Sequence, residues 1–236
     1  MRGIKNVFVL LFFILVSSSC SVANKPSSNN SQDACSNLLV FKSNESNVTI
    51  KSAVNIAAGP VPPVMYQRPY AGTLAGYCRV DGVIDERVGE SGKPYAIGFA
   101  IALPEKWNGR FMMQGGGGLN GSVATPLGSS AAGDTTALQR GFAVVTTDTG
   151  HQGEHGFDAG FFSYQEATLN FLYQAIGKVA VTSKQIVAQY YGKTIDHSYY
   201  MGCSTGGREA MIMSQRYPRL FDGIVAGAPA MRTSFS

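Results

Sequence analysis

The feature that most constrains this chain is a hexapeptide, residues 202–207 (GCSTGG), set between two segments of different periodicity. It follows residues 197–201 (HSYYM), an aromatic-rich run typical of a buried strand. It precedes residues 208–216 (REAMIMSQR), which are good helix formers and end before a Tyr-Pro pair. Strand, sharp turn and helix is the context in which a G-x-S-x-G motif presents a nucleophilic serine.

Small residues are needed on both sides of such a serine because the turn is crowded. Gly202 and Gly206 stand two residues before and two residues after Ser204. We therefore predict that Ser204 is a nucleophile raised above a sheet, and that the Thr205 backbone N–H helps to stabilise an oxyanion. The alternative is a glycine-rich turn whose serine only caps the helix. The flanking strand and helix favour the nucleophile.

The same stretch resembles the tannase and feruloyl esterase family, which includes mono(2-hydroxyethyl) terephthalate hydrolases. The resemblance is carried by residues 202–209 (GCSTGGRE), 217–218 (YP), 221–223 (FDG) and 227–230 (GAPA). It implies an α/β-hydrolase fold in which the Cys beside the nucleophile is joined to a Cys adjacent to the catalytic His. For this chain, it implies that Cys203 forms a disulfide whose partner lies outside residues 1–236.

Size and charge narrow the classes of function. The 236 residues, 44% hydrophobic and 14% charged, can bury the core of one domain. A net charge of +4 without a basic run argues against nucleic acid as a partner. Four cysteines without C-x-x-C spacing, and three scattered histidines, argue against a metal site. We expect no cofactor in this chain, and the resemblance places the family's calcium site in a lid domain beyond it.

The N-terminus is predicted to be an export signal, residues 1–20. Two basic residues precede an apolar run over residues 7–16 that is too short to span a bilayer. The small residues that follow resemble a bacterial lipoprotein processing site with Cys20 as the lipidated residue, and cleavage after Ala23 is the competing interpretation. Residues 21–34, rich in Ser and Asn, are expected to be a flexible spacer. The protein is thus expected to be secreted, periplasmic or an outer-surface lipoprotein, and lipid at Cys20 would be its membrane contact.

The remaining residues, 35–236, are predicted to form the N-terminal part of an α/β-hydrolase catalytic domain. Export implies an oxidising compartment, in which disulfides are expected. Members of the family carry an early disulfide, and the resemblance pairs Cys35 with Cys78. The bond would pin the N-terminal segment to the first strand of the sheet.

Periodicity predicts the order of the elements. Apolar alternation predicts an antiparallel pair of strands, whereas the region between the two early cysteines is expected to be mostly turn and extended chain. Apolar runs predict further strands, the last two of them buried, and one helix that Gly177 and Thr182 weaken near its middle, so that it could kink or form two pieces. The predicted strands are residues 78–87, 95–103, 110–114, 141–148 and 223–226, and the predicted helix is residues 170–191.

Four consecutive glycines, residues 115–118, follow the predicted strand 110–114. A backbone without side chains lets a substrate carbonyl approach, and an N–H of Gly116, Gly117 or Gly118, with Gly117 and Gly118 favoured, would supply the second oxyanion hydrogen bond. The alternative is a plain flexible turn. Asn120 and Ser122 lie beside the glycines and are expected to line the cleft.

Asp148 and His151, at the end of the predicted strand 141–148, offer an apparent acid and base. In this fold the acid and the base follow the serine in chain order, whereas these two precede it. We therefore expect both to hydrogen-bond loop backbone and to take no part in a catalytic triad.

The sequence is consequently expected to be a fragment, the first half of a family member, without the triad Asp and His and nearly inactive by itself. The resemblance implies that the full-length protein is a serine carboxylic-ester hydrolase acting on small aromatic acyl esters of the galloyl, feruloyl or terephthalate-monoester type. The alternative is a non-catalytic surface binding module, or a decayed hydrolase fragment. The intact elbow and glycine loop argue against that alternative.

Overall fold

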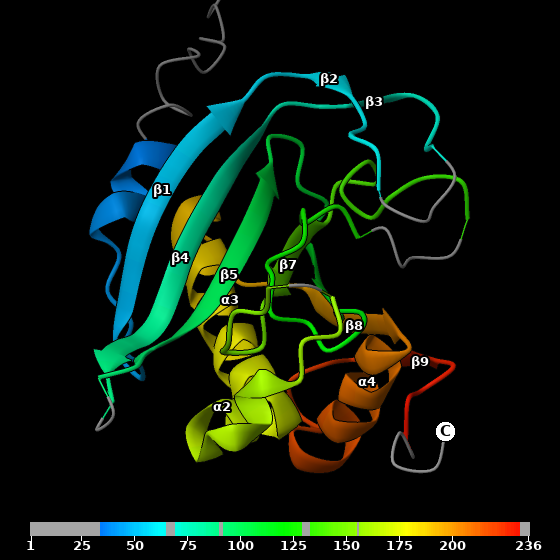
Figure 1. Ribbon diagram of the computed structural model, residues 1–236. Helices are drawn as coiled ribbons and strands as arrows, with labels where there is room; N and C mark the ends of the chain where they lie inside the picture. Colours follow the sequence, from blue (N-terminus) through cyan, green and yellow to red (C-terminus); the bar gives the residue numbers. More distant parts are fainter. Residues whose placement is uncertain (1–33, 65–68, 90–91, 129–132, 155, 232–236) are drawn as a thin grey trace, which may run out of the picture.

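The computed structural model describes residues 34–64, 69–89, 92–128, 133–154 and 156–231. The predicted export signal, Cys20 and all but the last residue of the predicted spacer lie outside these ranges. The described chain is built on a seven-stranded sheet with the strand order β1-β4-β5-β7-β6-β8-β9 (Figure 1). Its strands are β1 (Val48–Ile56), β4 (Tyr77–Val88), β5 (Pro94–Pro104), β6 (Arg110–Gln114), β7 (Ala143–Thr147), β8 (His197–Cys203) and β9 (Gly223–Gly227). A separate pair consists of β2 (Gly59–Pro60) and β3 (Thr73–Leu74).

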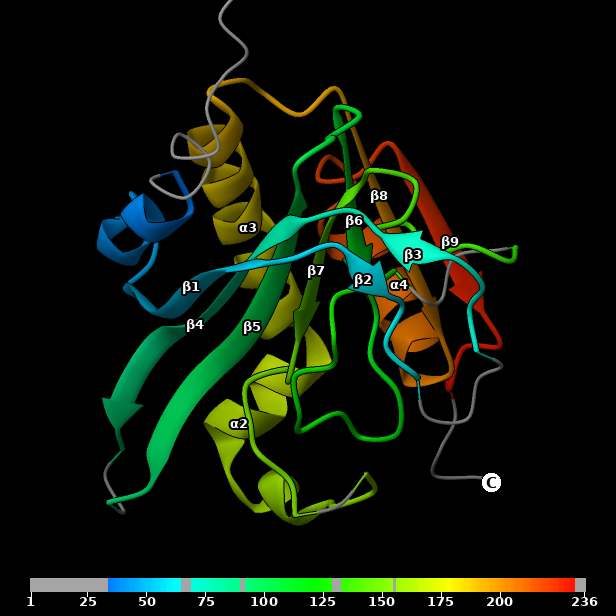
Figure 2. The same ribbon diagram turned by 90° about the horizontal axis from the view of Figure 1, so that it is seen from above.

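The sheet is antiparallel in its first part and parallel in its second. β1, β4, β5 and β7 are paired antiparallel to one another in turn, and β7, β6, β8 and β9 are paired parallel. In Figure 2 the long strands β1, β4 and β5 splay away from the shorter parallel strands. The predicted opening antiparallel unit, β4 with β5, is therefore present.

Strand β1 is an element that the prediction of turn and extended chain missed. Its register against β4 shifts between Ile50 and Ser52, so its buried residues do not keep a strict alternation. A bulge of this kind inserts a residue and moves the apolar positions that follow it to the other parity. The period-two signal is therefore broken within the strand.

The two faces of the sheet carry different cores, which follow from the period of two. Phe111, Met113 and Val145 face one core, and Met112 and Val144 face the other. The first core is covered by the helices α3 (Ala175–Tyr191) and α4 (Thr205–Arg216), which contact each other. The second is closed by side chains from loops and from β3, namely Leu74, Leu127, Ala137 and Leu138. Loops therefore cover the face opposite the two helices.

The predicted helix 170–191 is one part of a longer and less regular segment. It comprises η2 (Gly160–Ser163), α2 (Gln165–Leu169), a π-helical turn η3 (Asn170–Gln174) and α3. Residues 170–191 therefore do form two pieces, but the irregularity lies at residues 170–174 and not at Gly177 or Thr182, which lie within α3. Gly177 has a packing role, because a Cβ there would lie 2.5 Å from Cζ of Tyr217. A further short helix, η1 (Asn37–Val40), lies near the N-terminal end of the described chain.

Two other expectations concern the early disulfide and the last strand, β9. Cys35 and Cys78 form a disulfide, and both are fully buried. The pair joins the start of the described chain to β4, as the resemblance implies. By contrast, the expectation that β9 is buried is wrong for the described chain, because β9 pairs only with β8 and Val225 is 51% exposed.

Candidate active site

Ser204 occupies a strained turn between β8 and α4. Its backbone dihedrals are φ 58° and ψ −118°, a region that residues with a side chain rarely adopt. The turn is fixed by two hydrogen bonds to the end of β9 and the segment that follows it: the Ser204 N–H donates to the Gly227 carbonyl at 3.1 Å, and the Ala230 N–H donates to the Ser204 carbonyl at 3.0 Å. The Ser204 side chain remains exposed, as does Cys203.

The two elbow glycines are required by contact distances. A Cβ at Gly202 would lie 2.5 Å from the backbone carbonyl carbon and oxygen of Gly206, and a Cβ at Gly206 would lie 2.7 Å from the Gly116 carbonyl oxygen. In each case the obstacle is backbone, which cannot rotate away as a flexible side chain could. The crowding that the sequence indicated is therefore present at both positions.

Helix α4 begins at Thr205, three residues earlier than the sequence predicted. The first N–H groups of a helix have no partner within it, and within the described ranges the Thr205 N–H has no hydrogen-bond acceptor. The Thr205 side chain is buried, and its hydroxyl donates a hydrogen bond to the Gly118 carbonyl. The residue after Ser204 thus connects the elbow to the glycine loop, while its amide has no acceptor among the described residues.

The first two glycines of the loop have their amides occupied. The Gly115 N–H donates to the Met201 carbonyl at 2.8 Å, and the Gly116 N–H donates to Oε2 of Glu209 at 3.1 Å. The Gly116 carbonyl accepts a hydrogen bond from the Gly206 N–H at 3.0 Å. The loop is therefore attached both to the end of β8 and to the first turns of α4.

The last two glycines of the loop differ from the first two. In the part of the chain that the structure describes, neither the Gly117 nor the Gly118 N–H has an acceptor. A Cβ at Gly117 would meet no atom within 4 Å, whereas Gly118 has φ 58° and a Cβ there would lie 2.2 Å from the Gly156 carbonyl oxygen. Gly117 and Gly118 are thus the loop amides available to an incoming oxyanion, and their role remains a prediction.

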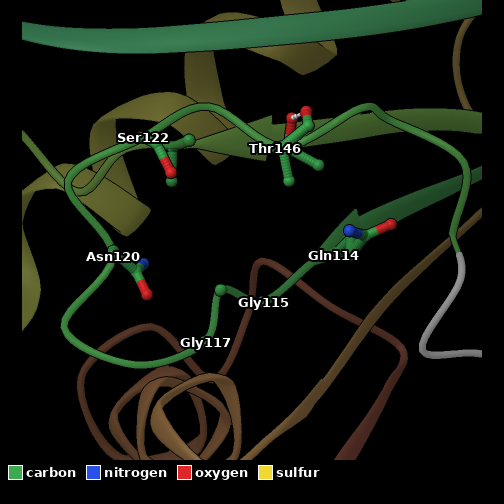
Figure 3. Close-up of a pocket in the computed structure, with 9 residues that line it drawn as sticks. Gln114, Gly115, Gly117, Asn120, Ser122 and Thr146 are labelled. Atoms are coloured by element: carbon green, nitrogen blue, oxygen red, sulfur yellow. Dashed lines mark hydrogen bonds between the residues drawn. The ribbon is translucent and has the colours of Figure 1, made fainter. Parts of the chain in front are cut away.

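A small cavity of about 70 Å³ lies beside the glycine loop. Figure 3 shows Asn120 and Gln114 at its two ends, with Thr146 across the cavity from Gly115. Asn120 and Ser122 both line it, but its lining does not include Ser204. The cavity therefore lies next to the loop, and Ser204 is not part of its lining.

Glu209 is a site residue to which the sequence reasoning gave no role. It is fully buried and accepts hydrogen bonds from the Tyr200 hydroxyl, the Gly116 N–H and the Asn120 side-chain amide. Burial raises the pKa of its carboxyl group, and these donors act in the opposite direction. A spacing signal existed, because Thr205, Glu209 and Met213 follow one another at intervals of four on the buried side of α4.

Asp148 behaves as predicted, and His151 does so only in part. Oδ1 of Asp148 accepts hydrogen bonds from the N–H groups of Gly98 and Gly150, at 2.9 and 2.8 Å, and burial raises its pKa to about 7. His151 stacks on the Phe161 ring at 3.8 Å between centroids, and neither ring nitrogen has a hydrogen-bond partner among the described residues. Burial lowers the His151 pKa, and the nearby backbone of Leu119 and Thr149 acts in the opposite direction. The expected backbone hydrogen bonds are thus present for Asp148, whereas His151 packs against an aromatic ring.

Over the described ranges, no cluster of three or more His, Cys, Asp or Glu side chains is arranged to hold a metal ion. None of the helices in those ranges is long and apolar enough to cross a membrane.

The sheet, the elbow and the glycine loop together define the α/β-hydrolase fold, and solved structures share it. Feruloyl esterase B from Aspergillus oryzae is similar with a TM-score of 0.69 at 30% identity, covering 86% of this chain and 38% of that one. A tannin acyl hydrolase from Aspergillus niger, at 22% identity and a TM-score of 0.62, has the same fold over 86% of this chain and 37% of that one.

Sequence comparison identifies the family. Residues 78–234 match the profile described as "Tannase and feruloyl esterase", and the chain belongs to that family. It is 44% identical over 166 residues to a mono(2-hydroxyethyl) terephthalate hydrolase of Piscinibacter sakaiensis, which covers 67% of this chain and 28% of the relative. It is 37% identical over 156 residues to a probable feruloyl esterase B-2 of Neosartorya fischeri, which covers 66% of this chain and 27% of the relative. The matched part of the chain thus spans about a third or less of these relatives' length.

Proposed function

We propose that this chain carries the nucleophile and oxyanion-binding part of a serine carboxylic-ester hydrolase that acts on small aromatic acyl esters. The observation that carries the proposal is the exposed Ser204 at φ 58°, ψ −118°, on a strand-to-helix turn beside amides without acceptors. Acyl transfer needs a strained, exposed serine next to free N–H groups, whereas a serine that only caps a helix needs neither the strain nor the free N–H groups. Relatives named as feruloyl esterases and a terephthalate-monoester hydrolase support the substrate class.

In the proposed reaction the Ser204 hydroxyl oxygen attacks the ester carbonyl carbon. The negative charge that develops on the carbonyl oxygen is stabilised by the Thr205 N–H and by an N–H of Gly117 or Gly118. A histidine from outside residues 1–236, oriented by an aspartate, takes the serine proton and passes it to the leaving alcohol. Water then hydrolyses the acyl-enzyme by the reverse sequence of proton transfers.

The proposal extends to the domain, the disulfides and the location of the protein. We propose that residues 35–236 form the N-terminal part of the catalytic domain, and that Cys203, which is free among the described residues, pairs with a cysteine near that histidine. Such a bond would hold the nucleophile and the base together. The buried Cys35–Cys78 disulfide supports export to an oxidising compartment, where such bonds persist. Lipid attachment at Cys20 and simple cleavage after Ala23 remain the two forms of that export.

The test is covalent labelling of the protein expressed from its complete reading frame. A fluorophosphonate probe should label Ser204 and should fail to label Ser204→Ala, and the wild type should hydrolyse feruloyl, galloyl or terephthalate monoesters. A cap serine would not react, since it has neither a base nor an oxyanion site. A folded full-length protein that takes up no label would contradict the proposal and favour the non-catalytic surface binding module.

A further inference from the structure

Glu209 is a buried carboxylate that the proposed reaction does not use. It is 0% exposed. Its Oε2 accepts hydrogen bonds from the Tyr200 hydroxyl at 2.6 Å and from the Gly116 N–H at 3.1 Å, and its Oε1 accepts one from Nδ2 of Asn120 at 2.8 Å. Within the described ranges no Lys, Arg or His side chain forms an ion pair with it.

Burying a carboxylate at this position costs folding free energy, so its presence calls for an explanation beyond the filling of space. Removing an ionisable group from water is unfavourable, and the hydrogen bonds that it gains offset that cost only in part. An apolar side chain would fill the space, as Met213 does one turn later on the same face of α4. What an apolar residue cannot do is accept hydrogen bonds from Gly116 and Asn120, which lie on either side of the free loop amides.

The first contact of Glu209 fixes Gly116 in the loop. Gly116 has no side chain, so its dihedral angles are otherwise weakly restrained. Its N–H is bonded to Glu209 and its carbonyl to the Gly206 N–H at 3.0 Å, so both of its backbone polar groups are attached to α4. Because the Gly116–Gly117 peptide is planar, holding the Gly116 carbonyl also sets the direction of the Gly117 N–H.

A second attachment lies beyond the glycines. The Asn120 side chain bonds to Glu209 and also covers Gly116, where an added Cβ would lie 2.2 Å from Asn120 side-chain atoms. Asn120 itself has φ 54°, an unusual backbone conformation that needs such support. One carboxylate thus holds the loop before and after the amides at Gly117 and Gly118.

We propose that Glu209 is a positioning residue, which holds the glycine loop against α4 so that the loop N–H groups are in place before the ester binds. This inference rests on the proposed esterase function. Preorganised donors stabilise the transition state more than the bound ester, so their displacement affects kcat rather than KM. If Glu209 served stability alone, its substitution would lower the melting temperature without lowering kcat relative to KM.

The experiment uses the protein expressed from its complete reading frame and three variants. Glu209→Met keeps the length of the side chain and removes both acceptor oxygens, and Glu209→Gln keeps one oxygen for the Gly116 N–H. Met213→Ala is the matched control, because it opens a cavity in the apolar core one turn along the same helix and removes no hydrogen-bonding group. For each protein we would measure the melting temperature, kcat and KM with an aryl ester, and amide hydrogen exchange across residues 115–120.

For Glu209→Met we expect kcat to fall by about tenfold to a hundredfold with KM nearly unchanged. Exchange across the loop should become faster, and Glu209→Gln should recover most of both losses. Met213→Ala should lower the melting temperature and leave kcat and loop exchange as in the wild type.

The proposal is overturned if Glu209→Met keeps the wild-type kcat, or if the Gln and Met variants behave alike. If Glu209→Met does not fold, Glu209→Met with Tyr200→Phe carries the same test, since it also removes the hydroxyl left without an acceptor. A wild type that hydrolyses no ester would refute the proposed function. The exchange data would then still decide whether Glu209 holds the loop.

Discussion

Replacing Gly206 by alanine should displace the glycine loop from the elbow. The new Cβ would lie 2.7 Å from the Gly116 carbonyl oxygen, and ordinary contact begins at 3.4 Å, so the two backbones must separate by 0.7 Å (3.4 − 2.7). If that movement falls on the 3.0 Å hydrogen bond from the Gly206 N–H to the Gly116 carbonyl, the bond is lost. Forcing extra volume into a packed site costs about 1–3 kcal/mol, from which the better helix propensity of alanine subtracts up to about 1 kcal/mol.

The larger effect should be on catalysis. A displacement approaching 1 Å at groups that position the reacting atoms can reduce the rate by about a hundredfold. We therefore expect kcat of Gly206→Ala to fall by about tenfold to a hundredfold, with KM little changed because the ground-state contacts of the ester are elsewhere.

The assay pairs urea unfolding with steady-state kinetics on an aryl ester. Gly59→Ala, where a Cβ would meet no atom closer than 4.0 Å, serves as the control and should match the wild type in both measurements. If Gly206→Ala were destabilised but kept the wild-type kcat, the contact between the elbow and the loop would not position the oxyanion donors. The reasoning would then be refuted.

Three further predictions concern Asp148, the Cys35–Cys78 disulfide and Gly117. Because burial raises the pKa of Asp148 to about 7, its contribution to stability is present below the unfolded-state pKa and is lost as the pH rises through 7. Relative to Asp148→Asn, the wild type should therefore lose about 4 kcal/mol of unfolding free energy between pH 4 and pH 8. A difference between the two proteins that stays constant with pH would contradict this. Cys35→Ser with Cys78→Ser opens a loop of 43 residues' separation and should cost about 4 kcal/mol in urea unfolding under non-reducing conditions, whereas an unchanged midpoint would show that the bond contributes little. Gly117→Ala should unfold at or slightly above the wild-type urea midpoint, since the new Cβ would meet no atom within 4 Å. It should nevertheless lower kcat, because the methyl group would stand where the ester must approach. Full activity would place the second oxyanion donor elsewhere.

The local parts of the site could be predicted from the sequence because their constraints lie between near neighbours. The elbow needs small residues two positions before and after Ser204, and both glycines prove to face backbone at 2.5–2.7 Å. Strand β8 and helix α4 follow directly from the residues on either side. Only the first turn of α4 was missed, because Thr205, Gly206 and Gly207 are weak helix formers that tertiary contacts nevertheless hold in the helix.

The remaining parts depend on contacts between distant residues. The hydrogen bond from the Gly116 N–H to Glu209 spans 93 positions in the sequence, and no local pattern near either residue indicates the other. Strand β1 was missed because a bulge interrupts its alternation. The glycine at 177 indicated weakness in a helix, whereas its reason lies in the Tyr217 ring that packs against it.

The geometry of the elbow and the loop explains why the glycine loop has free amides at all. Gly115 donates to the end of β8, Gly116 donates to Glu209, and the Gly116 carbonyl is occupied by the Gly206 N–H, so the chain reaches Gly117 with its direction already set. On the other side, the Thr205 hydroxyl bonds to the Gly118 carbonyl, and the Thr205 amide, at the first position of α4, has no acceptor among the described residues. The proposed oxyanion donors are thus oriented by contacts among described residues alone, without the proposed histidine and aspartate. Preorganisation of the oxyanion site and supply of the base are therefore separate properties, and substitutions at Glu209 or Gly206 should impair the first while leaving the second intact.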